Sequence, residues 1–210
     1  MKSEGAKRST PKGRANGNRM TNDPMILERA EVRTPLGRVL LLARRGKLVG
    51  LEFADRPKRC AALRRRLTRS LGPFAERPAR DAAGAAARLR RYFEGDTKAL
   101  AGQPLASHGT PFQRSVWRAL ASIPSGRTLS YAAVARKLGR PRATRAVAAA
   151  NAANPVALFV PCHRVIASDG SPHGYGGGIA RKRWLLAHEA LQAHVDRRAA
   201  ASSPAKSAVP

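Results

Sequence analysis

The alternation of apolar and polar residues divides the chain into a strand-rich first part and a helical second part. Three short apolar runs cover residues 26–32, 37–46 and 47–55, and the turn sequences TPLG and RRGK separate them, a pattern typical of an antiparallel β-meander. Leucines then recur at i, i+4 and i+8 within residues 58–71, which predicts an amphipathic helix, and residues 80–94 predict a second one. The sequence therefore predicts a small N-terminal α/β domain over residues 25–99.

A linker at residues 100–109, with glycine, proline and serine, precedes the helical part. Thr110 and Gln113 form a capping box, and Pro111 fits the first helical position, so a largely buried helix is predicted to start here.

Two shorter helices follow. Ser130 is expected to cap the first, which ends at Gly139, and the second runs from about 143 to 153. On pattern alone the pair is either a helix-turn-helix or an ordinary αα-hairpin. The apolar run at 155–160 is predicted to be a strand that ends at Pro161.

These elements define an α/β chain of the α+β kind, with a mainly helical, winged helix-turn-helix-type domain over residues 110–192. The polar, low-complexity ends, residues 1–24 and 193–210, are predicted to be disordered.

The net charge of +27 adds a candidate partner. Such a charge favours a polyanion through long-range attraction and counterion release, and nucleic acid is the first candidate. An anionic membrane surface or an arginine-rich codon bias would also produce part of this imbalance. We expect a cytoplasmic protein, because the sequence has no apolar run long enough to span a membrane and no secretory signal.

The chain has two cysteines, Cys60 and Cys162. Two cysteines without a histidine cluster make neither a disulfide framework nor a structural zinc site, so no metal is expected. Cys60 has the character of a small core residue.

One face of the second short helix carries Arg145, Ala148, Ala149 and Ala152, at i, i+3, i+4 and i+7. A cation that leads a strip of methyl groups either packs tightly on another helix or enters a narrow DNA groove. Other basic residues crowd the same end of the helix and favour DNA: Lys137, Arg140 and Arg142.

Cys162 and His163 stand together in the sequence PCHRV. A thiolate is the reactive form of cysteine, and His163 is the nearest base, although neighbouring residues on a strand point to opposite faces. A turn or a bridging water would join the two side chains. Glu189, one turn after Leu185 on a predicted helix, is the candidate to orient His163. The alternatives are an inert buried thiol at Cys162 and a solvated carboxylate at Glu189.

The loop at 168–178 is rich in glycine and contains Tyr175. It lacks the lysine of a phosphate-binding loop. Tyr175 is a candidate to stack on a planar ligand, and a plain flexible loop is the alternative.

Together, GTPFQRSVWRAL, IPSGRTLSYAAVARKLGRPRATRAVAAANAANP, VPCHRVI and GYGGGIARKRWLLAHE resemble the methylated-DNA–protein-cysteine methyltransferases, also called O6-alkylguanine-DNA alkyltransferases. The resemblance covers residues 25–190 and is nearly continuous from 109 to 190. It implies an irreversible, cofactor-free, single-turnover transfer of an alkyl group from O6 of guanine, or O4 of thymine, to Cys162. The implied partner is double-stranded DNA with alkylated bases, bound by a monomer.

The resemblance also implies a role for each matching residue. His163 would deprotonate Cys162 through a water, Glu189 would support His163, and Asn154 would be a hinge. Arg145 would fill the gap left by a flipped nucleotide, and Tyr131 would press on the adjacent phosphate. The pocket for the guanine would be lined by Tyr175 and by the backbone at Val165 and Gly176.

Two rival functions stay open at this stage. One is a non-catalytic, alkyltransferase-like protein that binds the lesion without repairing it, although those relatives lack the reactive cysteine. The other is a DNA-binding regulator that uses the helix-turn-helix alone.

Overall fold

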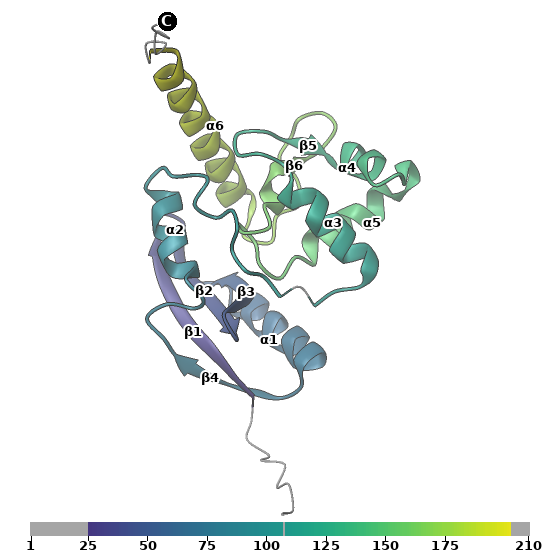
Figure 1. The fold of residues 1–210 in the computed structure, drawn as a ribbon. Coiled ribbons are helices and arrows are strands. Elements are labelled where there is room, and N and C mark those ends of the chain that lie inside the picture. The colour runs from purple at the N-terminus through teal and green to yellow at the C-terminus, as the bar shows by residue number, and fades with distance from the viewer. Residues whose placement is uncertain (1–24, 107, 203–210) are drawn as a thin grey trace, which may run out of the picture.

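The computed structural model describes residues 25–106 and 108–202 (Figure 1). The expected disorder at residues 1–24 and 203–210 lies outside the described residues. Along residues 25–106 and 108–202, fourteen elements follow one another: β1 (Met25–Thr34), β2 (Gly37–Arg44), β3 (Lys47–Phe53), α1 (Pro57–Leu71), β4 (Phe74–Pro78), α2 (Ala85–Phe93), α3 (Pro111–Ala121), β5 (Leu129–Ser130), α4 (Tyr131–Lys137), η1 (Pro141–Ala143), α5 (Thr144–Ala152), η2 (Cys162–Arg164), β6 (Val165–Ile166) and α6 (Ile179–Ser202). The predicted mixture of an N-terminal sheet and a helical second part is confirmed.

The N-terminal unit is a four-stranded sheet in the order β3-β2-β1-β4. The predicted meander forms its first three strands, with Val32 opposite Val39 and Leu41 opposite Leu51. The strand β4 was not predicted, and it pairs in parallel with β1.

Different helices pack on the two faces of this sheet. Leu63 and Leu67 of α1 pack with strand residues such as Leu42, as the leucine periodicity predicts. On the other face, Leu89 and Tyr92 of α2 belong to the main core, which continues into the second half of the chain. The sheet therefore joins the two halves through one hydrophobic core.

The helices of the second half begin where their caps predict. Both hydrogen bonds of the Thr110–Gln113 capping box are present at α3, and Ser130 Oγ accepts a hydrogen bond from the amide of Ala133 at α4. The helices α3, α4 and α5 pack together, and the short parallel pair β5–β6 lies beside them (Figure 1). This arrangement gives the predicted helix-turn-helix, with η1 in its turn.

Two sequence predictions are wrong. Residues 155–160 do not form a strand but a buried loop with isolated bridges, in which Leu158 has a positive φ of 72°. The run is apolar because it is buried in the core, and burial alone does not require a sheet ladder. Residues 193–202 are not disordered, because α6 continues through them and its end projects beyond the body of the molecule (Figure 1). Alanine and arginine are good helix formers, which explains the extension.

The first part of the linker, residues 100–106, lies along the N-terminal unit, where the amide of Leu48 donates to the carbonyl of Pro104 at 2.9 Å. Within the described ranges, no helix has the length and apolar character that a membrane crossing requires.

Candidate active site

Cys162 lies in a short 3-10 turn, η2, between Pro161 and the strand β6. All three residues of this turn are buried: Cys162, His163 and Arg164. Because the turn replaces the expected strand end, neighbouring side chains diverge around it rather than alternating across a sheet. His163 and Arg164 point toward α6, while Cys162 lines a small cavity.

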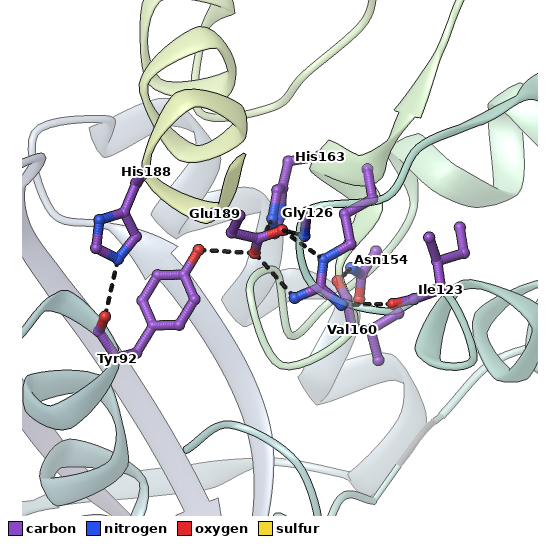
Figure 2. Close-up of polar contacts among 9 residues, drawn as sticks. Tyr92, Ile123, Gly126, Asn154, Val160, His163, His188 and Glu189 are labelled. Atoms are coloured by element: carbon purple, nitrogen blue, oxygen red, sulfur yellow. Dashed lines mark hydrogen bonds and ion pairs between the residues drawn. The ribbon is translucent and has the colours of Figure 1, made fainter. Parts of the chain in front are cut away.

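Glu189 of α6 accepts hydrogen bonds from the residues beside the cysteine. Its Oε1 lies 2.9 Å from Nε2 of His163 and 2.8 Å from Nη2 of Arg164, and its Oε2 lies 2.8 Å from Nε of Arg164 (Figure 2). Tyr92 donates its hydroxyl to Oε1 at 2.8 Å, and the amide of Gly126 donates to Oε2 at 3.3 Å. The carboxylate is 1% exposed, so the protein has replaced its water shell with donors from three segments of the chain.

This environment sets the charge of both partners. Burial alone would raise the pKa of Glu189, but the hydrogen bonds from His163 and Arg164 and the charge of Arg164 outweigh burial and hold that pKa well below its usual range. Burial lowers the pKa of His163 in spite of the neighbouring carboxylate. At neutral pH the site therefore holds an ionised Glu189 and a neutral imidazole.

The tautomer of His163 follows from these charges. A carboxylate only accepts hydrogen bonds, so Nε2 carries the proton and Nδ1 keeps its lone pair. Nδ1 is buried and finds no hydrogen-bond partner among the described residues. It is therefore the atom of this imidazole that is available to accept a proton.

The thiol of Cys162 is in its protonated form at rest. Burial raises its pKa, although the Asn154 amide and the cation of Lys182 pull it in the opposite direction. Lys182 is itself buried, with a pKa lowered by burial to about 8, and its Nζ donates to the carbonyls of Val165 and His173. A thiol of this kind needs a base at the moment it reacts.

Two asparagines join α5 to the loop of the cysteine. Asn154 donates from Nδ2 to the carbonyl of Val160 at 2.8 Å (Figure 2). Its Oδ1 accepts from the amide of Val156 at 3.0 Å. Asn151 donates to the carbonyl of Cys162 at 3.4 Å. The end of α5 and the loop of the cysteine are thus held in one hydrogen-bonded unit.

The alanine strip of α5 faces outward. Arg145, Ala149 and Ala152 are exposed and Ala148 is half-buried. The opposite side of the helix packs on α3, where Trp117 donates to the carbonyl of Ala150 at 2.9 Å. The exposed strip is therefore open to a partner. Further exposed cations surround the start of α5: Arg136, Lys137, Arg140 and Arg142.

The cavity beside Cys162 has a volume of about 20 Å³, which is room for about one water molecule. Of the expected pocket residues, Tyr175 and Gly176 line it, together with Ala152 and Asn154. Val165 does not belong to the lining, and its carbonyl accepts from Lys182. Tyr131 is half-buried outside the cavity and donates to the carbonyl of His173 at 3.3 Å.

Several residues of this site were missed by sequence reasoning. Arg164 follows directly after His163 and close to the apolar run at 155–160, and this position was a usable signal, because a buried cation needs a carboxylate. Tyr92 and Glu189 are 97 positions apart, so no local pattern links them. Glu52, Phe53 and Arg59 of the N-terminal unit also line the cavity and carried no signal at all.

Metal binding has no support in the described part of the chain, which contains no group of three or more histidine, cysteine, aspartate or glutamate residues in a metal-binding arrangement. Both cysteines are free thiols.

Comparison with known proteins gives the same identification from several directions. Residues 111–191 match the family model described as 6-O-methylguanine DNA methyltransferase, DNA binding domain. A curated methylated-DNA–protein-cysteine methyltransferase of Shigella flexneri is 51% identical over 106 residues, which are 50% of this chain and 62% of that protein. The match thus spans less than two thirds of that relative's length.

Two further comparisons extend over most of the chain. A methylated-DNA–protein-cysteine methyltransferase of Mycolicibacterium paratuberculosis is 41% identical over 167 residues, covering 78% of this chain and 93% of that protein. The solved structure of Mycobacterium tuberculosis OGT in complex with DNA is similar at a TM-score of 0.66 and 36% identity, covering 80% of this chain and 94% of that one. The similarity therefore includes the N-terminal unit as well as the helical half.

Proposed function

The chain belongs to the family of methylated-DNA–protein-cysteine methyltransferases, and on that premise we propose that it repairs DNA by moving an alkyl group from O6 of guanine to its own Cys162. The observation that carries this proposal is the arrangement around the cavity: the thiol lines it, and behind the thiol lie a neutral His163 and an ionised Glu189. We extend the proposal to O4 of alkylated thymine, which presents the same kind of oxygen-bound alkyl group.

The proton of the thiol leaves first. Nδ1 of His163 has an available lone pair, and a bridging water would relay the proton from Cys162 to this atom. The positive charge that develops on the imidazole is stabilised by Glu189, 2.9 Å from Nε2. Glu189 and His163 together form the base unit that activates the nucleophile Cys162.

The thiolate then attacks the alkyl carbon. A carbon–sulfur bond forms, the bond between this carbon and O6 breaks, and the electron pair goes to the guanine. The proton that left the thiol balances the proton that the restored guanine gains at N1. The product is a thioether without an easy leaving group, so each molecule of protein reacts once and needs no cofactor.

Access to the lesion requires that the base leaves the helix. Extrusion of a base costs a few kcal/mol and is least costly for a badly paired base. We propose that the protein binds DNA as a monomer and that the exposed strip of α5 enters a groove of the duplex. Arg145 then fills the gap left by the extruded base, and Tyr131 acts on the neighbouring phosphate. Asn154 then links α5 to the reactive turn.

The test is to incubate the protein with duplex DNA that carries O6-methylguanine and to measure peptide masses. We expect the Cys162 peptide to gain about 14 Da, one methyl group, and the Cys162→Ser variant to gain none. A protein that binds the lesion but shows no mass gain would be a lesion-binding protein, and the proposal would fail.

A further inference from the structure

Part of the cavity wall comes from the N-terminal unit. Glu52 and Phe53 at the end of β3, and Arg59 in the first turns of α1, line it together with Cys162. The glycines after Tyr175 lie directly against these residues. A Cβ atom on Gly177 would stand 2.6 Å from the Phe53 ring, so only a glycine fits this close approach.

Arg59 lies across Gly176. A Cβ atom on Gly176 would stand 2.3 Å from Nη2 and 2.6 Å from Cζ of Arg59. The guanidinium therefore occupies the space that a side chain at position 176 would need, at one wall of the cavity that Cys162 lines.

Glu52 holds Arg59 in this position. Its Oε2 accepts from Nε of Arg59 at 2.8 Å, and its Oε1 accepts from the amide of Phe53 at 3.0 Å. The side chain of Glu52 is 10% exposed and that of Arg59 is 39% exposed. Glu52 is thus fixed, while Arg59 is a long, partly solvated side chain tied by one ion pair.

The size of the cavity makes this contact important. A space of about 20 Å³ holds a water molecule but not a purine with its alkyl group. Some part of the wall must move before a base reaches Cys162. Tyr175 is buried and Phe53 is in the core, whereas Arg59 can leave by rotating its own side chain and breaking one ion pair.

We propose that Arg59, tied to Glu52, is the access residue of the alkylated-base pocket: it closes the cavity over Gly176 in the free protein and swings out when a base enters. The inference rests on the proposed function for the identity of the incoming base. It gives the N-terminal unit a direct part in admitting the substrate.

The first experiment measures access to Cys162 without any methyl transfer. Iodoacetamide alkylation of the full chain is followed by peptide mass in the wild type, Arg59→Ala, Arg59→Lys and Arg64→Ala. We expect Arg59→Ala to speed alkylation of Cys162 about threefold to fivefold, the range that one partly exposed ion pair supports. Arg59→Lys, which can keep the ion pair, should restore most of the protection. Arg64 is the matched control, because it lies on the same helix and pairs with Glu76 at 2.6 Å, away from the cavity.

The direction of the change separates access from charge. Arg59 also lowers the pKa of Cys162 slightly, so loss of its charge alone would slow alkylation. Measured between pH 7 and pH 9.5, an access effect raises the rate by the same factor throughout. A slower rate in Arg59→Ala, or a rate equal to that of the wild type, overturns the proposal.

Cys60 provides an internal control for loosening of α1. It is 6% exposed and lies next to Arg59 in the same helix. If Arg59→Ala accelerates alkylation of Cys60 as much as that of Cys162, the helix has loosened and the proposal is wrong.

A second experiment uses free O6-methylguanine base. Arg59→Ala should accept its methyl group faster than the wild type by a factor similar to that seen with iodoacetamide. If no variant accepts a methyl group, the proposed function fails, while the iodoacetamide comparison still decides the role of Arg59.

Discussion

Glu189 and Arg164 form a buried ion pair with two parallel contacts, from Nε to Oε2 and from Nη2 to Oε1, each 2.8 Å long. Arg164 also donates to the carbonyl of Ile123, so a third hydrogen bond fixes its own position (Figure 2). The residue directly after His163 thus orients the carboxylate that holds the imidazole. The base unit is rigid before any substrate arrives.

The variant Glu189→Gln tests this unit. An amide nitrogen cannot accept from Arg164 or Tyr92, and a neutral amide cannot stabilise an imidazolium. We expect the single-turnover rate of methyl transfer to fall about 10²-fold or more, and the free energy of unfolding to fall by about 3–5 kcal/mol because Arg164 keeps a buried, unpaired charge. Single-turnover assays and urea unfolding measure the two effects.

Tyr92→Phe is the control for that experiment, since it removes a single donor to Oε1 and leaves the carboxylate charged. Its stability should fall by only about 1 kcal/mol. If the single-turnover rate of methyl transfer falls by the same factor in both variants, the charge of Glu189 has no special part in the reaction.

The free energy of unfolding should depend on pH in a defined direction. The pKa of His163 is lowered in the folded protein from its ordinary value of 6.5, so the unfolded chain takes up the proton first. The contribution of His163 to the free energy of unfolding is then complete above about pH 6.5 and declines below it. The pKa of Glu189 is also depressed, and its contribution is lost only as the pH falls below its ordinary value of 4.5 toward the folded value.

Urea unfolding between about pH 2 and pH 8 checks this profile. The variant His163→Gln should lose the first decline and keep the second. Wild-type stability that increases from pH 7 to pH 5 would mean that His163 is charged in the folded protein.

Arg145→Ala should separate DNA handling from chemistry. Arg145 is exposed on α5 and does not line the cavity of Cys162, so free O6-methylguanine base should react at the wild-type rate. Reaction with the lesion in a duplex should slow by about tenfold or more, because an extruded base has no replacement in the stack. Arg90→Ala, which removes an exposed charge on α2, is the matched control. Equal losses on both substrates would make Arg145 a structural residue.

Duplex binding should weaken steeply with salt. Five exposed cations lie on and around the start of α5, and each phosphate contact releases counterions: Arg136, Lys137, Arg140, Arg142 and Arg145. A plot of log affinity against log salt should have a slope of about −3 to −5, measured by fluorescence anisotropy on unmodified duplex. A flat plot would contradict the assignment of this surface to DNA.

Local signals in the sequence predicted much of the fold. The Thr110–Gln113 capping box and the cap at Ser130 depend on residues three positions apart, and both formed as expected. Glu189 was placed near His163 because it follows Leu185 by one turn on an inward face, and the 2.9 Å contact agrees. In these cases the spacing of residues along a helix is enough to predict the feature.

Other features depend on contacts between distant segments. The cover of Arg59 over Gly176 joins residues 117 positions apart, and the Tyr92–Glu189 bond joins residues 97 apart. The apolar run at 155–160 looked like a strand because burial in a core loop selects the same side chains as burial in a sheet. The sequence indicates that this run is buried, but it does not indicate which segments pack against it.

The most direct test of the central claim is the stoichiometry of methyl transfer at Cys162. With O6-methylguanine duplex in excess, we predict one methyl group per protein molecule, found only on the Cys162 peptide, an equal amount of restored guanine, and no further turnover. Repeated turnover, a methyl group on another residue, or lesion binding with an unchanged Cys162 peptide would contradict the account.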